Sequence, residues 1–268
     1  MSSEIVKGGA GAGSPNFVWY EFHTADAAGA ARFYSSVLGW GLHDAGMPDR
    51  SYTLVTVDNV QIGGTLQKPA SSFAVGGKPA WIGYIGVSNV DAYVGRLQQL
   101  GGSVHRAAED IPNVGRFAVV ADPQGANFVL FQPSNADQQA ERPMPGAPGS
   151  PAWHDLIAID WQADFTFYAD MFGWTKSDAV DMGPNGVYQV FACDGVPIGG
   201  MMNRMDPVQT PAWLYYFAVE EIGAAVDRVR QHGGTVTHGP AVVPGGQQVA
   251  QCLDPQGAIF ALVGPEED

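Results

Sequence analysis

The feature that most constrains this 268-residue chain is that its sequence repeats itself. Four blocks occur twice, in the same order and at nearly constant separation. The matching blocks are 26–40 with 160–174, 58–64 with 194–200, 79–104 with 211–236, and 121–133 with 253–265. Shared order and spacing over most of the chain indicate an internal duplication, which predicts two domains of one fold.

The segments between and before the copies have a different composition. Residues 134–151 read "SNADQQAERPMPGAPGSP", which is rich in Pro, Gly and polar residues and is typical of a linker. The first residues, "MSSEIVKGGAGAGSP", lack the apolar core of a signal peptide and favour a flexible tail. We therefore expect a tail at 1–15, a first domain at 16–133, a linker at 134–151 and a second domain at 152–265.

The composition limits the partners of such a chain. Its formal net charge is −14, which disfavours binding to phosphate backbones or anionic lipid headgroups. No apolar run is long enough to cross a bilayer. The two cysteines, Cys193 and Cys252, form neither a disulfide framework nor a zinc spacing, so we expect both in the core. We expect a cytoplasmic protein without nucleic acid or membrane partners.

Each copy has the same internal rhythm of predicted elements. Asp26 is placed to cap a helix, and Gly101-Gly102 to end one. In the first copy the expected elements are a strand at 17–24, a helix at about 26–37, strands at about 51–57 and 61–67, a strand at 81–87, a helix at about 89–100, and strands at about 103–107, 116–121 and 126–132. A strand, a helix and further strands therefore occur twice per copy and four times in the chain.

The stretch "VWYEFHTAD" at 18–26 raises a question about metal binding. On a strand, Trp19, Glu21 and His23 point to one face, and a Glu and a His two residues apart could share a metal ion. The second copy has Ile157 where His23 stands in the first. The pattern is therefore not repeated, and a scattered His is more often hydrogen-bonded than a ligand.

Three motifs, each present twice, carry a family resemblance. They are D-x6-F-Y-x4-G-W at 26–40 and 160–174, an apolar strand and amphipathic helix ending in G-G at 81–102 and 213–234, and D-P-Q-G-A before an apolar strand at 122–131 and 254–263. Together they resemble the vicinal oxygen chelate superfamily, which includes glyoxalase I, bleomycin-resistance proteins, fosfomycin-resistance enzymes and extradiol dioxygenases. The chain is most similar to tandem members that are often labelled hydroxylases.

The resemblance implies a fold and an assembly. The fold is α+β, a tandem duplication of glyoxalase-like domains, each built from two βαβββ modules, four in all. Strands curl around one cleft per copy. Because the duplication supplies internally the pairing that single-copy relatives obtain by dimerisation, we expect a monomer or a weak homodimer.

The resemblance also implies where metal ligands would lie. The family positions map to Trp19, Ile82 and Val129 in the first copy and to Trp153, Leu214 and Ala261 in the second, with the last position near Thr65 and Met201. None of the six firmly mapped side chains can coordinate a metal. We therefore predict no metal and no cofactor, which disfavours the ion-dependent chemistry of glyoxalases and dioxygenases.

Strand alternation predicts what faces each cleft instead. The candidate catalytic residues are a carboxylate and a tyrosine from each copy: Glu21, Asp155, Tyr84 and Tyr216. The candidate ligand-binding residues are Trp19, His23, Ile82, Asn127, Val129, Phe131, Trp153, Leu214 and Ala261. Apolar walls with a few polar groups are typical of a small-molecule site. The same residues could equally be packing groups and satisfied buried polar groups.

Three functions remain open from the sequence. The first is a metal-independent protein that binds a small hydrophobic or aromatic molecule. The second is a metal-independent hydroxylase-, lyase- or isomerase-like enzyme of secondary or detoxification metabolism, with a cleft carboxylate as base and a tyrosine as acid. The third is a metal-dependent lyase or dioxygenase with ligands outside the family pattern. The sequence does not decide between binder and enzyme.

Overall fold

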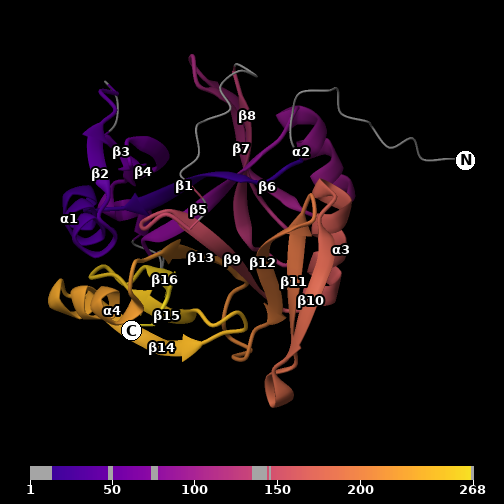
Figure 1. Ribbon diagram of the computed structural model, residues 1–268. Coiled ribbons are helices and arrows are strands. Elements are labelled where there is room, and N and C mark those ends of the chain that lie inside the picture. Colours follow the sequence, from indigo (N-terminus) through magenta and orange to yellow (C-terminus); the bar gives the residue numbers. More distant parts are fainter. Residues whose placement is uncertain (1–13, 48–50, 74–77, 135–143, 145, 267–268) are drawn as a thin grey trace, which may run out of the picture.

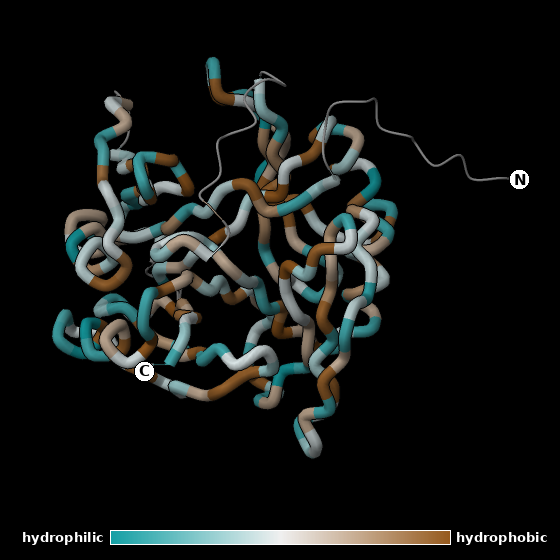
Figure 2. Tube along the Cα trace, viewed as in Figure 1, coloured by the Kyte–Doolittle hydropathy of each residue, from teal (hydrophilic) through white to brown (hydrophobic). Residues whose placement is uncertain are grey.

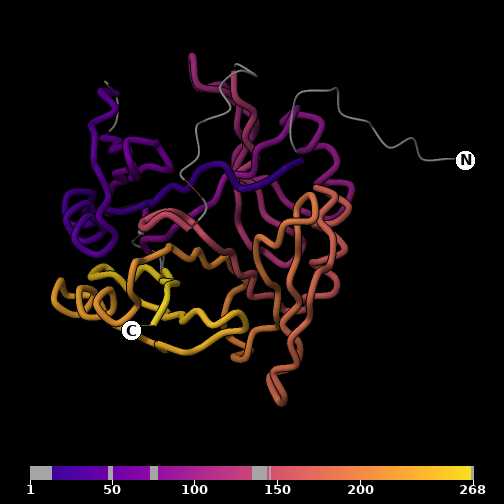
Figure 3. The backbone as a smooth tube through the Cα atoms, viewed as in Figure 1, coloured from indigo at the N-terminus to yellow at the C-terminus, as the bar shows by residue number. Residues whose placement is uncertain are grey.

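The two copies form two similar halves of one molecule. The computed structural model describes residues 14–47, 51–73, 78–134, 144 and 146–266, and every structural statement below refers to these. The first copy, indigo to magenta, and the second, salmon to yellow, lie against each other in Figure 3. Part of the predicted tail and most of the predicted linker lie outside the described residues.

The first half contains eight strands and two α-helices among the described residues (Figure 1). They are β1 (Phe17–Thr24), α1 (Ala27–Leu38), β2 (Gly41–Asp44), β3 (Tyr52–Val57), β4 (Val60–Gln67), β5 (Ala80–Gly86), α2 (Val90–Gln99), β6 (Ser103–Ile111), β7 (Gly115–Ala121) and β8 (Asn127–Pro133). A short 3-10 helix, η1 (Ala70–Phe73), follows β4.

The second half repeats this order. Its elements are β9 (Pro151–Ala158), α3 (Trp161–Phe172), β10 (Thr175–Asp181), η2 (Gly183–Asn185), β11 (Val187–Cys193), β12 (Val196–Asn203), β13 (Ala212–Ala218), α4 (Ile222–Gln231), β14 (Thr235–Val242), β15 (Gln248–Leu253) and β16 (Ile259–Gly264).

Each half folds into one mixed sheet of eight strands. The strand order is β2-β3-β4-β1-β5-β8-β7-β6 in the first and β10-β11-β12-β9-β13-β16-β15-β14 in the second. In the first sheet β1 runs parallel to β4 and antiparallel to β5, and β5 runs parallel to β8. These sheets consist of four βαβββ modules in tandem, which confirms the predicted fold class.

One strand of each first module was missing from the predicted elements. Strand β2, with the sequence GLHD, has two half-buried and two exposed residues at the edge of its sheet, and β10, which is mostly exposed, occupies the same edge of the other sheet. Neither has the alternation of apolar and polar residues that marks a half-buried strand. Figure 2 shows that hydrophobic and hydrophilic residues follow one another along both halves of the chain.

The predicted helix ends and turns are present. The Asp26 carboxylate accepts a hydrogen bond from the backbone N–H of Gly29 and caps α1. Helix α2 has Leu100 as its C-cap, directly before Gly101-Gly102, and Gly101 has φ of 91°, a conformation that glycine adopts without steric cost. Both cysteines are buried, as expected.

A continuous aromatic core joins the two halves. Helices α1 and α4 lie together at one side of the molecule, and α2 and α3 at the other (Figure 1). Between them, Phe17 stacks on His154 with ring centroids 4.1 Å apart, and Trp40 packs edge-on against Phe217 at 5.1 Å. Burial of large rings from both halves in one cluster makes separate unfolding of either half costly.

The D-P-Q-G motif links the halves reciprocally. In the second half the Asp254 carboxylate holds its own turn and accepts a hydrogen bond from Tyr34 of the first half at 3.3 Å. Asp122 does the same for Tyr168 at 3.0 Å. The sequence indicated only a hairpin turn here, and the structure adds a contact between domains that buries and satisfies each carboxylate.

No described helix has the length and apolar character needed to span a membrane.

Candidate functional site

Each sheet has a second, smaller apolar cluster on the face that carries no helix. In the first sheet its buried members are Ile82, Tyr84, Phe117 and Val129. In the second they are Leu214, Tyr216, Ala261 and Val263. Each of these side chains is at most 9 % exposed, although no helix covers this face. The sheet itself must therefore curl around the face and shield it from water. We call these faces the first and the second site.

The second site is built around a buried carboxylate. Asp155, on β9, is 5 % exposed. Its Oδ1 accepts a hydrogen bond from the Tyr188 hydroxyl at 2.6 Å, and its Oδ2 accepts one from the Tyr216 hydroxyl at 2.7 Å. The Trp153 indole N–H donates to the Tyr188 hydroxyl oxygen at 2.6 Å. Gln251 also hydrogen-bonds Tyr216. The carboxylate is therefore satisfied by neutral donors.

This environment shifts the acidity of the second site. Burial raises the pKa of Asp155 to about 6, and the hydrogen bonds from Tyr188, Tyr216 and Trp153 oppose the shift. Burial, together with the charge of Asp155, raises the pKa of both tyrosines above the ordinary value. Asp155 is therefore poised to exchange a proton near neutral pH, whereas the phenols stay protonated as hydrogen-bond donors.

The first site has the same core with charges added. Glu21, on β1, hydrogen-bonds the hydroxyls of Tyr52 and Tyr84, and the Trp19 indole donates to the Tyr52 hydroxyl at 3.0 Å. Burial and the charge of Glu21 raise the pKa of both tyrosines. The indole, the two phenols and the carboxylate recur at corresponding positions of the two sites, whereas Val119 stands where Gln251 contacts Tyr216 in the second site.

A basic chain then distinguishes the first site. His23 Nε2 lies 2.5 Å from Glu21 Oε1, and Lys68 Nζ lies 2.8 Å from His23 Nδ1. A protonated Lys68 donates to Nδ1, which places the imidazole proton on Nε2, where it is donated to Glu21. Partial burial lowers the pKa of Lys68, while the charge of Glu21 opposes that shift and the charge of Arg106 adds to it.

Glycines in β4 and β12 make room for the tyrosines. A Cβ on Gly64 would lie 2.3 Å from the Tyr52 hydroxyl, and one on Gly200 would lie 2.0 Å from Tyr188 Cζ. These are the last glycines of the repeated "IGG", so a tyrosine crosses the strand only because no side chain is there. Sequence reasoning missed Tyr52 and Tyr188. The signal was present, because both end the loops "GMPDRSY" and "DMGPNGVY" and precede an "IGG" strand.

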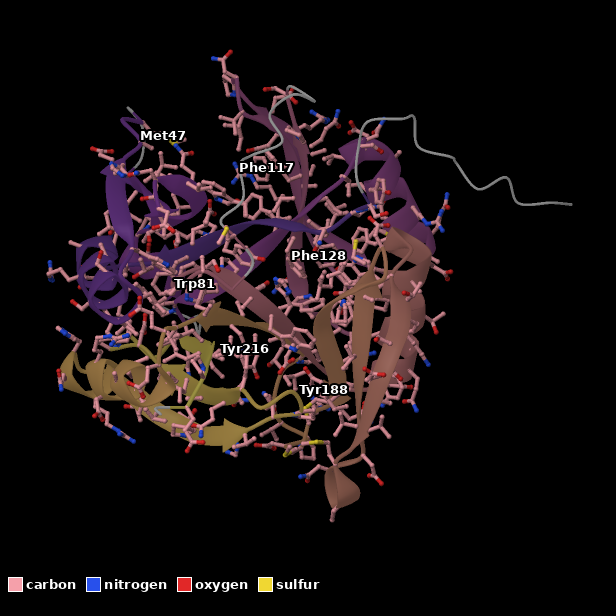
Figure 4. The ribbon with its side chains drawn as sticks, viewed as in Figure 1. Met47, Trp81, Phe117, Phe128, Tyr188 and Tyr216 are labelled. Carbon is pink, nitrogen blue, oxygen red and sulfur yellow. The ribbon has the colours of Figure 1, made fainter. Side chains whose placement is uncertain are left out.

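Most of the other candidate residues lie at neighbouring positions on adjacent strands of the two sheets. In the first site Trp19 pairs with Tyr84, Glu21 with Ile82, and Tyr84 with Val129 across neighbouring strands. Phe131 packs on the same cluster, while Asn127 is exposed at the start of β8. In the second site Trp153, Leu214 and Ala261 pack around Asp155 and Tyr216. In Figure 4 Phe117 marks the first half, and Tyr188 and Tyr216 mark the second.

A bulge in the strand pairing orients the indole of each site. The pairing of β1 with β5 shifts register between Phe17 and Trp19, and the pairing of β9 with β13 shifts next to Trp153. An extra residue at such a shift re-aims the neighbouring side chain. Both Trp19 and Val18 therefore pack on the first-site cluster, although they are adjacent in sequence.

His154 lies on the opposite strand face from its neighbour Asp155, because successive side chains of a strand point to opposite faces. It is buried between the halves, where Nδ1 is 2.6 Å from the Ile198 carbonyl oxygen and Nε2 is 2.6 Å from the Tyr20 hydroxyl. Burial lowers the pKa of His154 to about 4, so the ring is neutral at physiological pH. Its role is packing between domains.

The residues present do not fit the metal that the fold family implies. The mapped positions converge on the two sites, but they carry Trp, Ile or Leu, and Val or Ala side chains. His23 has both ring nitrogens engaged, by Lys68 and Glu21. Within the described part of the chain, no three His, Cys, Asp or Glu side chains are grouped so that they could hold an ion. A single carboxylate with phenol donors is a poor ligand set.

A groove elsewhere on the surface is separate from both sites. It lies between α1 and the second half, where Arg32 and Leu42 face His232 and Gln256. None of the residues lining it belongs to either site, and it follows the seam between domains.

The fold and the paired sites define a class of protein, the glyoxalase-like tandem proteins, and comparisons with known families agree. The family model described as "Glyoxalase/Bleomycin resistance protein/Dioxygenase superfamily" matches residues 152–262, and that described as "Glyoxalase-like domain" matches residues 19–131. The chain belongs to this superfamily, and each copy is one glyoxalase-like domain.

Two relatives match nearly the whole chain. CFP32 of Mycobacterium tuberculosis, named as a candidate glyoxylase, is 31% identical over 255 residues, which cover 94% of this chain and 95% of the relative. The anthracycline biosynthesis protein DnrV of Streptomyces peucetius is 30% identical over 258 residues, with 91% of each chain covered. The tandem arrangement is therefore shared with full-length relatives.

Solved structures of the same fold include a glyoxalase with bound Mn(II) and a dioxygenase. The Mn(II)-bound glyoxalase from Novosphingobium aromaticivorans has a TM-score of 0.67 at 14% identity and covers 95% of this chain and 83% of its own. A variant of homoprotocatechuate 2,3-dioxygenase from Brevibacterium fuscum has a TM-score of 0.67 at 17% identity, covering 98% and 75%. At these identities the likeness shows the fold alone.

Proposed function

We propose that this protein binds a small hydrophobic or aromatic molecule in one or both sites without using a metal ion. The observation that carries the proposal is the repeated unit of indole, two phenols and one buried carboxylate within an apolar cluster. Such a unit combines flat apolar walls with a few fixed polar groups, which is the composition of small-molecule sites.

The replacement of ligand side chains in both copies supports metal independence. If one copy had lost its ion by decay, the other would retain donors at the mapped positions. Instead Trp19 and Trp153 stand at the same position in the two copies, and each indole donates to a tyrosine. The indole, phenol and carboxylate therefore form an alternative structure that both copies share.

The two sites differ in the size of their walls. Phe117 and Phe131 of the first site correspond to Val249 and Val263 of the second, and Val129 corresponds to Ala261. Smaller side chains leave more room around Asp155, so we expect the second site to accept the bulkier ligand. The likeness to DnrV, named for anthracycline biosynthesis, is compatible with a polycyclic aromatic ligand.

A thermal-shift screen against aromatic compounds, run in excess chelator, tests binding. A ligand at one hundred times its Kd should stabilise the protein by about 2.7 kcal/mol, which raises the melting temperature of a domain this size by several degrees. We expect hits whose shifts are the same with and without EDTA. Shifts that vanish in EDTA would contradict metal independence, and the absence of hits from a broad aromatic library would count against the binding function.

The raised pKa of Asp155 favours a second candidate, a metal-independent enzyme with this carboxylate as general base. A base with a pKa near 6 can take a proton at neutral pH, and Tyr216, 2.7 Å away, could donate to a developing oxyanion. In an enzyme, Asp155→Asn should abolish turnover while ligand binding stays within a few-fold. Equal loss of binding and turnover would leave Asp155 as a binding group only.

A further inference from the structure

The first site gathers positive charge in a chain that has little of it. The protein has 13 Lys and Arg residues against 27 Asp and Glu. Lys68 follows β4, which lies inside the strand order, and Arg106 lies on β6 at one edge of the same sheet. Their charges nevertheless influence each other, and Arg106 also acts on Tyr84. The curled sheet therefore brings two cations to one site.

Both cations lie against the site rather than only in solvent. The Arg106 guanidinium lies 5.0 Å from the centre of the Phe117 ring, which is part of the first-site cluster. Lys68 is partly buried, and its ammonium contacts His23 Nδ1. Both cations therefore face groups of the first site, and both would attract an anion bound there.

The acidic side chains near Lys68 and Arg106 do not use all the hydrogen-bond donors of these two cations. Arg106 pairs with Glu109, but both side chains are about half exposed, and pairs of this kind contribute little. Glu21 acts on Lys68 through His23 rather than by direct contact. An ammonium has three donors, and His23 accepts one of them from Lys68 among the described residues. Donors therefore remain for a ligand.

The second copy has different groups at the matching positions. The positions that correspond to His23, Lys68 and Arg106 are Ile157, Arg204 and His238. Arg204 donates to the backbone carbonyl oxygen of Gln209, and His238 is exposed. Among the residues that the structure describes, the hydrogen bonds to the Asp155 carboxylate come from two tyrosines and an indole.

We propose that the first site takes an aromatic ligand that bears an anionic group, held by Lys68 and Arg106, whereas the second site takes an uncharged aromatic ligand. This assignment rests on the proposed function and names the ligand class for each site. The ring of the ligand packs on Trp19, Tyr84 and Phe117, and the anion accepts hydrogen bonds from the two cations.

A matched pair of fluorescent probes tests the assignment. The anionic probe is 1-anilinonaphthalene-8-sulfonate, and the neutral probe is N-phenyl-1-naphthylamine, which has the same rings without the sulfonate. Titrations would use the wild-type chain, Lys68→Met, Arg106→Met and the conservative Lys68→Arg. Arg204→Met is the control, because it removes the cation at the corresponding position of the second copy.

We expect each of Lys68→Met and Arg106→Met to weaken binding of the sulfonate probe about tenfold while the neutral probe changes less than about twofold. Lys68→Arg and Arg204→Met should stay close to wild type with both probes. Because the two first-site variants are independent, misfolding of one would not remove the test.

Three results would overturn the assignment. If both probes bind and the sulfonate probe is unaffected by either variant, the anion preference is wrong while the binding function stands. The same holds if both probes weaken equally, since that indicates lost packing rather than lost charge. If the wild-type chain binds neither probe, the proposed function fails together with the assignment.

Discussion

The two sites share one scaffold but treat its central carboxylate differently. In the first, Glu21 is part of a chain that runs through His23 to the ammonium of Lys68. In the second, Asp155 is 5 % exposed against 8 % for Glu21, and its donors in the described part of the chain are neutral. The comparison teaches that the duplication preserved the hydrogen-bonding unit of indole, phenols and carboxylate, whereas the charge around it diverged.

The largest expected effect concerns what the sites share. Gly64→Ala and Gly200→Ala should each destabilise the protein by about 2 to 4 kcal/mol, because the new Cβ would overlap Tyr52 or Tyr188 and separate that tyrosine from its carboxylate. Urea denaturation measures this. Gly95→Ala is the matched control, since a Cβ there meets nothing within 4 Å and the residue lies in α2. If Gly64→Ala or Gly200→Ala changed the free energy of unfolding no more than Gly95→Ala does, the tyrosine would not require a glycine at that position.

The two carboxylates should respond oppositely to neutralisation. Because the pKa of Asp155 is raised in the folded state to about 6, stability that is fully present below about pH 4 is lost as the pH rises through 6. Asp155→Asn, which cannot titrate, should lack this loss and should gain roughly 1 to 3 kcal/mol on the wild type between pH 4 and pH 7.5. Denaturation curves across this range provide the measurement.

Glu21→Gln should instead destabilise the protein at pH 7.5, by about 1 to 2 kcal/mol. It removes the negative charge that faces His23 and Lys68, and breaking one partner of a mostly buried pair leaves the other uncompensated. If Glu21→Gln and Asp155→Asn shifted stability in the same direction, the two sites would not differ electrostatically as described.

The smallest effect comes from transferring a residue between the copies. Ile157→His places an imidazole two residues from Asp155, where His23 stands relative to Glu21. A protonated neighbour favours the carboxylate, so the pKa of Asp155 should fall by about one pH unit. NMR titration of the Asp155 carboxyl carbon would detect the shift. An unchanged value would indicate that the added ring points away from the carboxylate.

Much of the fold could be predicted because the repeat and the strand alternation are encoded locally. The strand at β1 and the cap at Asp26 follow from short patterns of apolar and polar residues. Strands β2 and β10 could not be found this way, because an exposed edge strand has no buried face to impose alternation.

The candidate sites were only partly readable from the sequence. Trp19, Glu21 and Tyr84 follow from alternation on neighbouring strands, but Tyr52 reaches Glu21 by crossing over Gly64. Lys68 and Arg106 are 38 positions apart in the sequence. It is the tertiary fold that lets the charge of Arg106 act on Lys68. Contacts of this kind depend on tertiary geometry rather than on local pattern.

The most direct test of metal independence is the metal content of the untagged protein by elemental mass spectrometry. The protein would be incubated with Zn²⁺, Ni²⁺, Mn²⁺ and Fe²⁺ and then desalted. We predict less than about a tenth of an equivalent of any metal per chain, since a genuine site would bind near stoichiometrically. Retention of about one or two equivalents would contradict a metal-free site and would make Glu21, His23 and Asp155 the first residues to replace.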